Sequence, residues 1–322
     1  IIEMINQSEM NSLKKGDEVN HFLLIKKSEE KLTKANKVYL NLELADKSTS
    51  LQANLWDNFE SITKHLVPGE ILKIEGRIEE FQGNPQIRIE NFRLKKESEN
   101  VAVSDFLPKS NRDINEMLEE LHQRIKTVLD DNIRQLLNLV FEGKTLEVFS
   151  IVPAGKSWHH AYIHGLIEHT LEIVKICDLA ADIHPQINRD LLVCGALLHD
   201  IGKIEELSSE LNFEYTDRGK LLGHIVIAAL LVQKKIEEIP GFPSMLEDMI
   251  LHLVLSHQGK LEYASPVVPK TLEAITLYHA DELSAKMNAY KYAVKNDSRG
   301  DSNWTKFIPL ISTELFKLNR DF

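Results

Sequence analysis

The sequence lacks the features that mark membrane-spanning, disulfide-bonded or strongly basic proteins. Only two of its 322 residues are cysteines, Cys177 and Cys194. Both lie among apolar neighbours, so we expect reduced core thiols rather than a disulfide or a zinc pair. No apolar run approaches the length of a bilayer span, and residues 1–30 show no signal-peptide pattern. A chain that begins at Ile1 is expected to be a trimmed form or a fragment. Together these absences predict a cytoplasmic protein with no membrane partner.

Positive charge is also scarce, and the acidic excess is unevenly placed. The formal net charge is −11, yet residues 1–96 hold 15 basic and 15 acidic side chains. The remaining residues therefore carry the whole excess. A carboxylate-rich region suits a cation site, while the neutral region is free to present a local basic face to a polyanion.

Short segments of alternating polarity occupy the first third of the chain. Turn residues separate them at 46–48, 68–69 and 83–85. A helix is expected between the third and fourth segments, at Asp57–His65. Five short strands, with a helix between the third and the fourth, are typical of an OB-fold barrel. The expected strands are Val19–Ile25, Val38–Leu44, Leu51–Trp56, Ile71–Ile78 and Gln86–Phe92.

Helical periodicity replaces the alternation from Arg112 onward, after a polar segment at 95–111. We therefore expect residues 1–96 to form an all-β nucleic-acid-binding barrel, 97–150 a linker with a helical segment, and 151–322 an all-α bundle. After a helix that begins near Ile114, the expected helices are Asn132–Phe141, Gly165–Ile183, Arg189–Ile201, Leu221–Ile239, Ser244–His257 and Pro269–Lys295.

His199 and Asp200 are the most informative pair in the helical region. They follow the apolar run Leu191–Leu198, which reads as a core helix that stops at Gly202. A buried aspartate needs a partner, and a cation is a suitable one. Ten of the 13 histidines also lie between residues 159 and 279. The pattern therefore predicts a metal site.

Other potential ligands come from separate expected helices, as in helical bundles that build a central metal site. Imidazole and carboxylate ligands suit Mn, Fe, Ni, Co or Zn better than Ca or Mg alone. Neighbouring helical residues point about 100° apart, so His199 can bind one ion while Asp200 bridges to a second, as in two-metal phosphoester enzymes. The predicted ligand set is His169, His199, Asp200, His224, His257 and Asp281.

These residues carry a resemblance to known proteins. His169, the His199–Asp200 pair and Asp281 follow the H…HD…D order of the HD phosphohydrolase superfamily. His224 and His257 fall where binuclear members place extra histidines. With the expected barrel, the whole chain resembles the YhaM-type 3′-to-5′ exoribonucleases. The motifs that carry this wider resemblance are Trp158–Tyr162, Gly165–Thr170, Leu222–Ile225 and Leu261–Pro266.

The resemblance implies a fold, an activity and cofactors. It implies an OB-fold followed by an HD-domain helical bundle that removes nucleotides from the 3′ end of single-stranded RNA, with single-stranded DNA as a further substrate. It implies two divalent cations, with Mn²⁺ favoured over Co²⁺, Fe²⁺, Ni²⁺ or Zn²⁺. One would be held by His169, His199, Asp200 and Asp281, and the other by His224 and His257 with Asp200 bridging. The chain departs from the pattern at His164, where a glycine is expected, and at Gln258, where a second histidine would be unsurprising.

Several nearby residues have two readings each. Asp200 and Lys203 are the predicted catalytic residues. Lys203 either neutralises a phosphate oxygen or caps the C-terminal end of a helix. His159 and His160 either contact phosphate or a base, or serve capping and packing. Tyr263 is expected to line the cleft. His252 is expected to pack rather than to bind metal.

The expected barrel offers aromatic and basic side chains for a single strand. Aromatic faces stack on bases and a cationic groove follows the backbone. Phe81, between Arg77 and Arg88, is the best stacking candidate. Trp56 is a further nucleic-acid-binding candidate, although barrel aromatics more often lie in the core.

Three functions remain open from the sequence. The first is the exoribonuclease, a metal-dependent hydrolase. The second is a phosphohydrolase of free or cyclic nucleotides, against which the barrel argues. The third is a nucleic-acid-binding protein without activity, against which the intact ligand set argues. A homo-oligomer is compatible with each.

Overall fold

A computed structural model describes residues 7–33, 35–57, 59, 62–81, 83–156, 159–208, 213–295, 297, 302–308 and 311–317. The chain divides into two compact units. One comprises Ile1–Lys109 with Glu210–Asn212, and the other comprises Ser110–Ser209 with Phe213–Phe322. Each unit has its own hydrophobic core.

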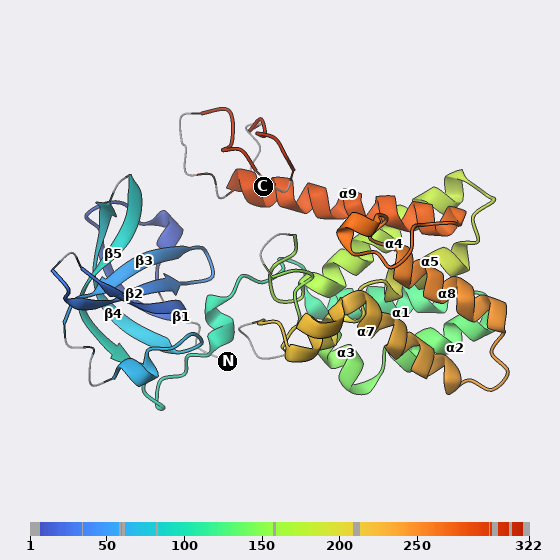
Figure 1. Ribbon diagram of the computed structural model, residues 1–322, viewed down its shortest axis with the longest axis horizontal. Coiled ribbons are helices and arrows are strands. Elements are labelled where there is room, and N and C mark those ends of the chain that lie inside the picture. The colour runs from blue at the N-terminus through green and yellow to red at the C-terminus, as the bar shows by residue number, and fades with distance from the viewer. Residues whose placement is uncertain are drawn as a thin grey trace. The chain divides into compact units, whose positions relative to one another are not determined.

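The first unit is a closed β-barrel (Figure 1). Its strands follow the order β1-β2-β3-β5-β4, and β3 and β5 pair in parallel while the other neighbours are antiparallel. The expected OB-fold barrel is therefore confirmed. The strands are β1 (Glu18–Leu32), β2 (Val38–Ala45), β3 (Ser50–Leu55), β4 (Ile71–Phe81) and β5 (Asn84–Leu94).

Closure of the barrel depends on β1, the longest strand. Its first half pairs with β4 and its second half with β2, with a register shift between Ile25 and Lys27. Such a bulge lets one strand bend far enough to join two neighbours. Alternate residues of β2, Leu40, Leu42 and Leu44, point into the core, as the period-two pattern predicts.

The segment between β3 and β4 differs from its prediction. A helix was expected over Asp57–His65, but its described part contains only a 3₁₀ turn at Thr63–His65. Residues 58, 60 and 61 lie outside the described part of the chain.

The second unit is helical (Figure 1), as expected. Helices α1 to α3 pack in the same core as the later helices. The helices are α1 (Ile114–Lys126), α2 (Asp131–Val140), α3 (Gly143–Phe149), α4 (Gly165–Ile183), α5 (Arg189–Leu198), α6 (Lys203–Glu206), α7 (Asp217–Glu237), α8 (Ser244–Ser256) and α9 (Leu272–Lys295).

Helix α5 is the buried centre of this unit. Asn188 caps its first turn by accepting a hydrogen bond from the Leu191 N–H, as expected for an asparagine N-cap. All residues from Leu191 to Leu198 are buried. Contacts with α4, α8 and α9 surround it. The residues that follow Leu198 therefore emerge inside the unit rather than at its surface.

The end of α5 corrects one prediction. The helix ends at Leu198 rather than at Gly202, and Gly202 has a right-handed φ of −64°. Gly202 is therefore not a left-handed helix stop. Its packing role is described below.

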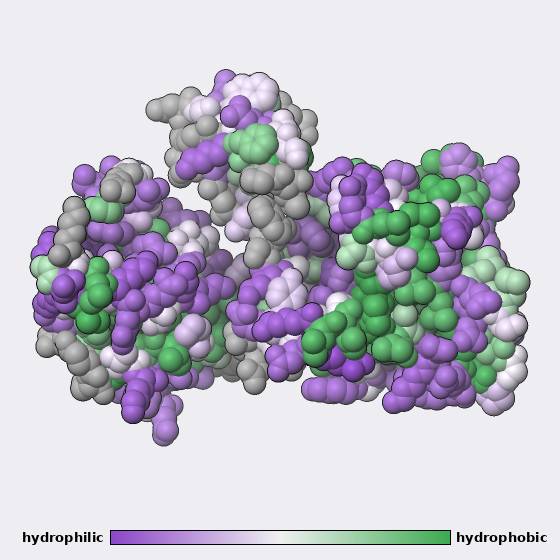
Figure 2. Space-filling view, viewed as in Figure 1, coloured by the Kyte–Doolittle hydropathy of each residue, from purple (hydrophilic) through white to green (hydrophobic). Residues whose placement is uncertain are grey.

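Apolar surface also occurs on the helical unit. Figure 2 shows hydrophobic side chains over α7, α8 and the segment that follows α8. On α7, the exposed residues Leu222, Val226 and Leu230 follow one another at intervals of four. Exposed apolar surface is common at interfaces, and the homo-oligomer stays a prediction. In the described part of the chain, no helix is long and apolar enough to cross a membrane.

Candidate metal centre

The candidate centre is built around the two residues that follow α5. His199 and Asp200 are almost wholly buried, with 0% and 2% of their surface exposed. Their position fits the prediction that the apolar helix delivers this pair to the interior. A carboxylate buried this deeply requires compensating partners.

Two glycines bring α7 close to this pair. A Cβ atom on Gly202 would lie 2.0 Å from the carbonyl oxygen of His224, so only glycine allows this approach of α6 to α7. Gly223 has a φ of +70° and interrupts α7 one residue before His224. This kink and the close packing explain why the imidazole of His224 reaches Asp200.

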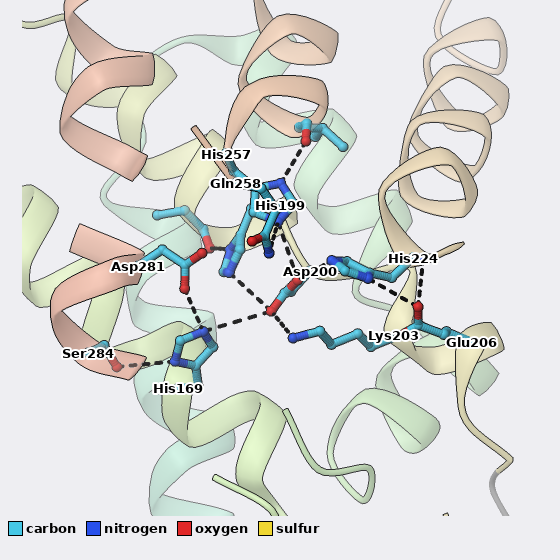
Figure 3. A network of polar contacts seen from close by, with 12 residues as sticks. His169, His199, Asp200, Lys203, Glu206, His224, His257, Gln258, Asp281 and Ser284 are labelled. Carbon is cyan, nitrogen blue, oxygen red and sulfur yellow. Dashed lines mark hydrogen bonds and ion pairs between the residues drawn. The ribbon is translucent and has the colours of Figure 1, made fainter. Parts of the chain in front are cut away.

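Asp200 lies between two pairs of imidazoles (Figure 3). Its Oδ2 atom is 3.3 Å from Nε2 of His199 and 3.8 Å from Nε2 of His169. Its Oδ1 atom is 3.4 Å from Nε2 of His224 and 3.6 Å from Nε2 of His257. The two carboxylate oxygens therefore face two separate sets of ligand atoms.

Asp281 completes the first set from α9. Its Oδ1 atom lies 3.2 Å from Nε2 of His169 on α4. Ligand atoms that share one cation at about 2.1 Å lie about 3 Å apart, so this separation is compatible with a shared ion. The structure thus brings together all six ligands predicted from the sequence.

The tautomers of these imidazoles suit metal binding. Nδ1 of His199 lies 2.9 Å from the Ala196 carbonyl oxygen, and Nδ1 of His257 lies 2.7 Å from that of Val254. Each Nδ1 must carry a proton to donate to its carbonyl, which leaves a lone pair on Nε2.

Buried ligand atoms without hydrogen-bond partners indicate that a cation fits this centre. Among the described residues, no hydrogen bond reaches Nε2 of His169, His199 or His224, or Oδ1 of Asp200, although these atoms are buried. Buried polar atoms rarely lack partners. A cation between the imidazole lone pairs and the carboxylate would satisfy all of them. The donor set of imidazole and carboxylate is that of a transition-metal site.

Burial and neighbouring charges shift the pKa values of the ligands in different directions. Burial lowers the pKa of His169 to about 4, although Asp281 opposes the shift, and burial also lowers the pKa of His257. Burial alone would raise the pKa of Asp200, but the charge of Lys203 and the nearby imidazoles hold it well below its usual range. Near neutral pH His169 and His257 are therefore uncharged and Asp200 is ionised. Burial alone would lower the pKa of His199, but the charges of Asp200 and Asp281 raise it.

Lys203 lies inside the centre rather than at a helix C-terminus. It begins α6, is buried, and donates a hydrogen bond from Nζ to Oδ2 of Asp200 at 2.5 Å. The capping alternative is therefore excluded by its position. A buried ammonium beside the ligands adds a fixed positive charge to the centre.

The two histidines before α4 have different positions. His159 is partly exposed, but its Nδ1 atom is buried, and its ring lies 5.1 Å from the ring of His169. Burial, followed by the charge of Lys203, lowers the pKa of His159 to about 3. The ring of His160 is wholly buried, with Nε2 3.3 Å from Oε2 of Glu172. Because nothing of His160 is exposed, the expected contact with nucleic acid does not fit its position. Trp158, beside them, lies outside the described residues.

The departures from the family pattern have local explanations. His164 has a φ of +68°, which lies in the left-handed region that glycine adopts most readily. The glycine expected there would thus relieve strain. Nε2 of Gln258 lies 3.4 Å from Nε2 of His257, at the edge of the second ligand set.

Sequence reasoning missed the side chains that support the ligands. Oε1 of Glu206 accepts hydrogen bonds from the backbone N–H of His224 at 2.9 Å and from its Nδ1 at 3.1 Å. Ser284 contacts Nδ1 of His169 at 3.1 Å. One available signal was spacing, because Ser284 follows Asp281 by one helical turn and thus lies on the same face of α9.

The predicted nucleic-acid residues outside the centre are exposed. Tyr263 is 51% exposed, and among the described residues no hydrogen bond or ion pair joins it to the six ligands. In the barrel, Trp56 is 48% exposed and Phe81, at the end of β4, is 60% exposed. The alternative that Trp56 lies in the core is therefore wrong.

One face of Trp56 is already covered. Its ring stacks on Tyr39 with 4.6 Å between centroids and 23° between planes. A cavity of about 530 Å³ adjoins it, and Arg88 and Phe92 also line this cavity. The position at β3 and β5 offers a base a preformed aromatic platform.

The predicted basic residues are paired with carboxylates. Arg77 lies 3.4 Å from Glu18 and 3.7 Å from Glu90, and Arg88 lies 3.1 Å from Glu79. All of these side chains are exposed, so the pairs are weak and exchangeable. The barrel face is therefore close to neutral until a polyanion competes for its arginines.

Comparison with known proteins agrees with this architecture. The model of the HD domain matches residues 166–286, and that of the OB-fold nucleic acid binding domain matches residues 25–94. The HD match covers all six predicted ligands on one continuous segment, with Asp281 near its end, as well as Lys203. It indicates a domain that binds divalent metal.

Whole-chain relatives agree as well. The protein named 3′-5′ exoribonuclease YhaM from Bacillus subtilis (strain 168) is 35% identical over 286 residues, which cover 89% of this chain and 90% of the relative. Its namesake from Oceanobacillus iheyensis is 37% identical over 292 residues, with the same coverage. That from Geobacillus sp. (strain WCH70) is 35% identical and covers 89% and 88%. The chain therefore belongs to the 3′-5′ exoribonuclease YhaM family.

Proposed function

We propose that this protein is a metal-dependent exoribonuclease that removes nucleotides from the 3′ end of single-stranded RNA. The observation that carries the proposal is the arrangement of Asp200, whose two oxygens face two sets of imidazoles. Phosphoester enzymes with two cations use such a bridging carboxylate. The names of the relatives support RNA as the substrate.

The ligands divide into two sets in this proposal. His169, His199, Asp200 and Asp281 would hold one cation, and His224, His257 and Asp200 the other. Two divalent cations held there would supply an activated water and neutralise charge on the reacting phosphate. Mn²⁺ is the expected metal because imidazole is the main donor, and Co²⁺, Fe²⁺, Ni²⁺ and Zn²⁺ suit the same set.

Two further side chains are assigned to the substrate. Lys203, already a hydrogen-bond donor to Asp200, would place its ammonium against a phosphate oxygen. His159, a partly exposed residue whose ring adjoins His169, would contact the terminal phosphate or base. Burial around these groups strengthens both interactions by lowering the local dielectric constant.

The barrel would hold the strand in this proposal. Trp56 and Phe81 would stack on bases, and Arg77 and Arg88 would exchange their carboxylate partners for phosphates. Tyr263 is a further exposed aromatic that a strand could reach. Single-stranded DNA offers the same bases and phosphates and is a second substrate to test.

The experiment is a digest of 5′-labelled single-stranded RNA, with single-stranded DNA, free nucleotides and a cyclic dinucleotide in parallel. We expect a ladder that shortens from the 3′ end of the RNA. Hydrolysis of the small nucleotides without the ladder would favour the phosphohydrolase, and binding without any cleavage would favour a non-enzymatic binding protein.

Substitution of Asp200 tests the assignment of the centre. Asp200→Asn should abolish hydrolysis, because an amide neither carries the charge nor bridges two cations well. Asp178→Asn is the matched control, since Asp178 pairs with Arg124 and Arg189 of the same unit, at 2.6 Å and 2.8 Å, and with none of the six predicted ligands among the described residues. If Asp200→Asn kept its melting temperature and more than about a tenth of wild-type turnover in saturating Mn²⁺, the two-cation assignment would be wrong.

A further inference from the structure

One ligand of the centre is supported in a different way from the others. Nδ1 of His199 and of His257 meets a backbone carbonyl, and Nδ1 of His224 meets the carboxylate of Glu206. Nδ1 of His169 instead meets a hydroxyl, Oγ of Ser284, at 3.1 Å. A hydroxyl can donate or accept, so it does not by itself fix the tautomer of the imidazole.

Glu172, the second partner of Ser284, decides which atom donates in the hydrogen bond between Ser284 and His169. Ser284 donates its hydroxyl hydrogen to Oε2 of Glu172 at 2.9 Å. Serine has a single O–H, so Oγ is left to accept the Nδ1–H of His169. The carboxylate of Glu172 therefore fixes, through Ser284, the tautomer in which Nε2 of His169 presents a lone pair to the centre.

Glu172 is itself held in place. Its Oε2 atom lies 3.3 Å from Nε2 of His160, whose backbone N–H donates to Oδ1 of Asn288 at 2.8 Å. Burial would raise the pKa of Glu172, but the close His160 imidazole and the hydrogen bond from Ser284 lower it to about 2, helped by the charge of Lys291. An ionised carboxylate can only accept hydrogen bonds. At neutral pH the hydrogen bonds therefore run from His169 to Ser284 and from Ser284 to Glu172, and we call these three residues the relay.

The sequence spacing places this relay on two facing helices. Glu172 follows His169 by three residues on α4, and Ser284 follows Asp281 by three residues on α9. Residues three apart lie on one face of a helix, and α4 packs directly against α9. Each helix therefore supplies one ligand and one member of the relay.

We propose that Glu172, acting through Ser284, is the positioning carboxylate for His169, as Glu206 is for His224. The inference rests on the proposed function, because it takes these imidazoles to be metal ligands. It adds that the two cation positions have separate supports: Ser284 and Glu172 behind the first, Glu206 behind the second. Partners that orient a ligating imidazole commonly contribute about 10–100-fold to metal affinity or activity.

The test measures Mn²⁺ binding to the full-length protein after removal of metal by a chelator, by the loss of the free Mn²⁺ signal in electron paramagnetic resonance. The variants are Ser284→Ala, Glu172→Met, Glu172→Gln and Glu206→Gln. Glu120→Met is the matched control, because Glu120 is an ion-paired carboxylate of the same unit, 2.6 Å from Arg112 and 3.0 Å from Lys175. Melting temperatures are recorded for every variant.

We expect the wild type to bind two Mn²⁺ ions. Ser284→Ala and Glu172→Met should each weaken one binding step by about 10–100-fold and leave the other unchanged. Glu172→Gln should lose less, since its amide oxygen can still accept from Ser284. The double variant Ser284→Ala/Glu172→Met should bind no more weakly than Ser284→Ala alone, because the carboxylate acts through the hydroxyl. Glu206→Gln should weaken the other step.

Several results would overturn the relay. These are unchanged Mn²⁺ binding in both Ser284→Ala and Glu172→Met, an equal loss at both steps that follows the melting temperature as in Glu120→Met, or additive losses in the double variant. Glu172→Gln keeps the size of the side chain, so it reports on the relay even if Glu172→Met does not fold. A wild-type protein that binds no Mn²⁺ would instead overturn the proposed function itself.

Discussion

The metal centre and the exposed face of the barrel differ in the burial of their side chains and in how firmly these side chains are held. In the centre, Asp200 is 2% exposed and each neighbouring imidazole has a polar partner at Nδ1. On the barrel, Trp56 is 48% exposed, and Arg77 and Arg88 pair with exposed carboxylates. Bond cleavage needs ligand atoms fixed to fractions of an ångström. Holding a strand of any sequence needs accessible rings and exchangeable charges.

Removal of metal should separate the two regions most strongly. Exhaustive chelation should lower the rate of RNA hydrolysis by at least about a hundredfold, since cations contribute several kcal/mol to transition-state stabilisation. RNA binding by the barrel should persist, because its rings and arginines need no metal. Mn²⁺ or Co²⁺ should restore hydrolysis better than Mg²⁺. Rates and filter-binding affinities measured on one chelated sample check this, and full activity with Mg²⁺ alone would contradict it.

Deletion of the barrel should give the reciprocal result. A fragment of residues 110–322 keeps every predicted ligand and one complete hydrophobic core. It should cleave a very short oligonucleotide at a near-normal rate. It should bind long RNA more weakly, release products of intermediate length, and show a smaller salt dependence, as fewer phosphates are contacted. Equal affinity for long RNA and an unchanged product ladder would mean that the barrel is not the strand holder.

Substitution of one aromatic residue of the barrel tests whether RNA binding can be weakened without a change in hydrolysis. Trp56→Ala should weaken binding of long RNA by about 1–3 kcal/mol, the usual value of one stacked base. Hydrolysis of a very short oligonucleotide should be unchanged. Phe307→Ala is the matched control, because Phe307 is an exposed aromatic outside the barrel. Equal affinities for the wild type and Trp56→Ala would remove this ring from the strand-binding face.

The smallest expected effect concerns the thiols of the helical unit. Cys177 and Cys194 are free and buried, and burial raises the pKa of both thiols well above its usual range. Buried thiols of this kind are unreactive. We expect almost no reaction with a thiol reagent in the native protein and reaction of both cysteines after unfolding. Rapid reaction of the native protein would show that the core around the centre opens easily.

The sequence predicted the elements that have strong periodicity. Strands β2 to β5 and the long helices α4, α7, α8 and α9 are close to their expected ranges, because burial of alternate or helically spaced residues fixes them. Strand β1 was expected to end at Ile25 but continues to Leu32, because its second half pairs with β2 and is largely exposed. The short helices α3 and α6 were not predicted, since four to seven residues are too few to show a helical period. The end of α5 was misplaced because Gly202 serves close packing rather than a left-handed turn.

The residues of the metal centre that belong to a sequence motif could be predicted. His169, His199, Asp200 and Asp281 are recognisable from their order, and the structure brings them together with His224 and His257. Glu172, Ser284 and Glu206 were missed because their roles depend on which helix faces which. The exposure of Trp56 could not be predicted either, since the alternation at the end of β3 does not say that Tyr39 backs the ring.

The measurement that tests the central claim most directly is the electron paramagnetic resonance spectrum of the Mn²⁺-loaded protein. If Asp200 bridges two cations about 3.5–4 Å apart, the wild type should bind two Mn²⁺ ions per chain and show the spectrum of a magnetically coupled pair. Asp200→Asn should lose the coupling, whereas the Asp178→Asn control should keep it. A single uncoupled Mn²⁺ ion in the wild type, or a coupled pair that survives in Asp200→Asn, would contradict the account.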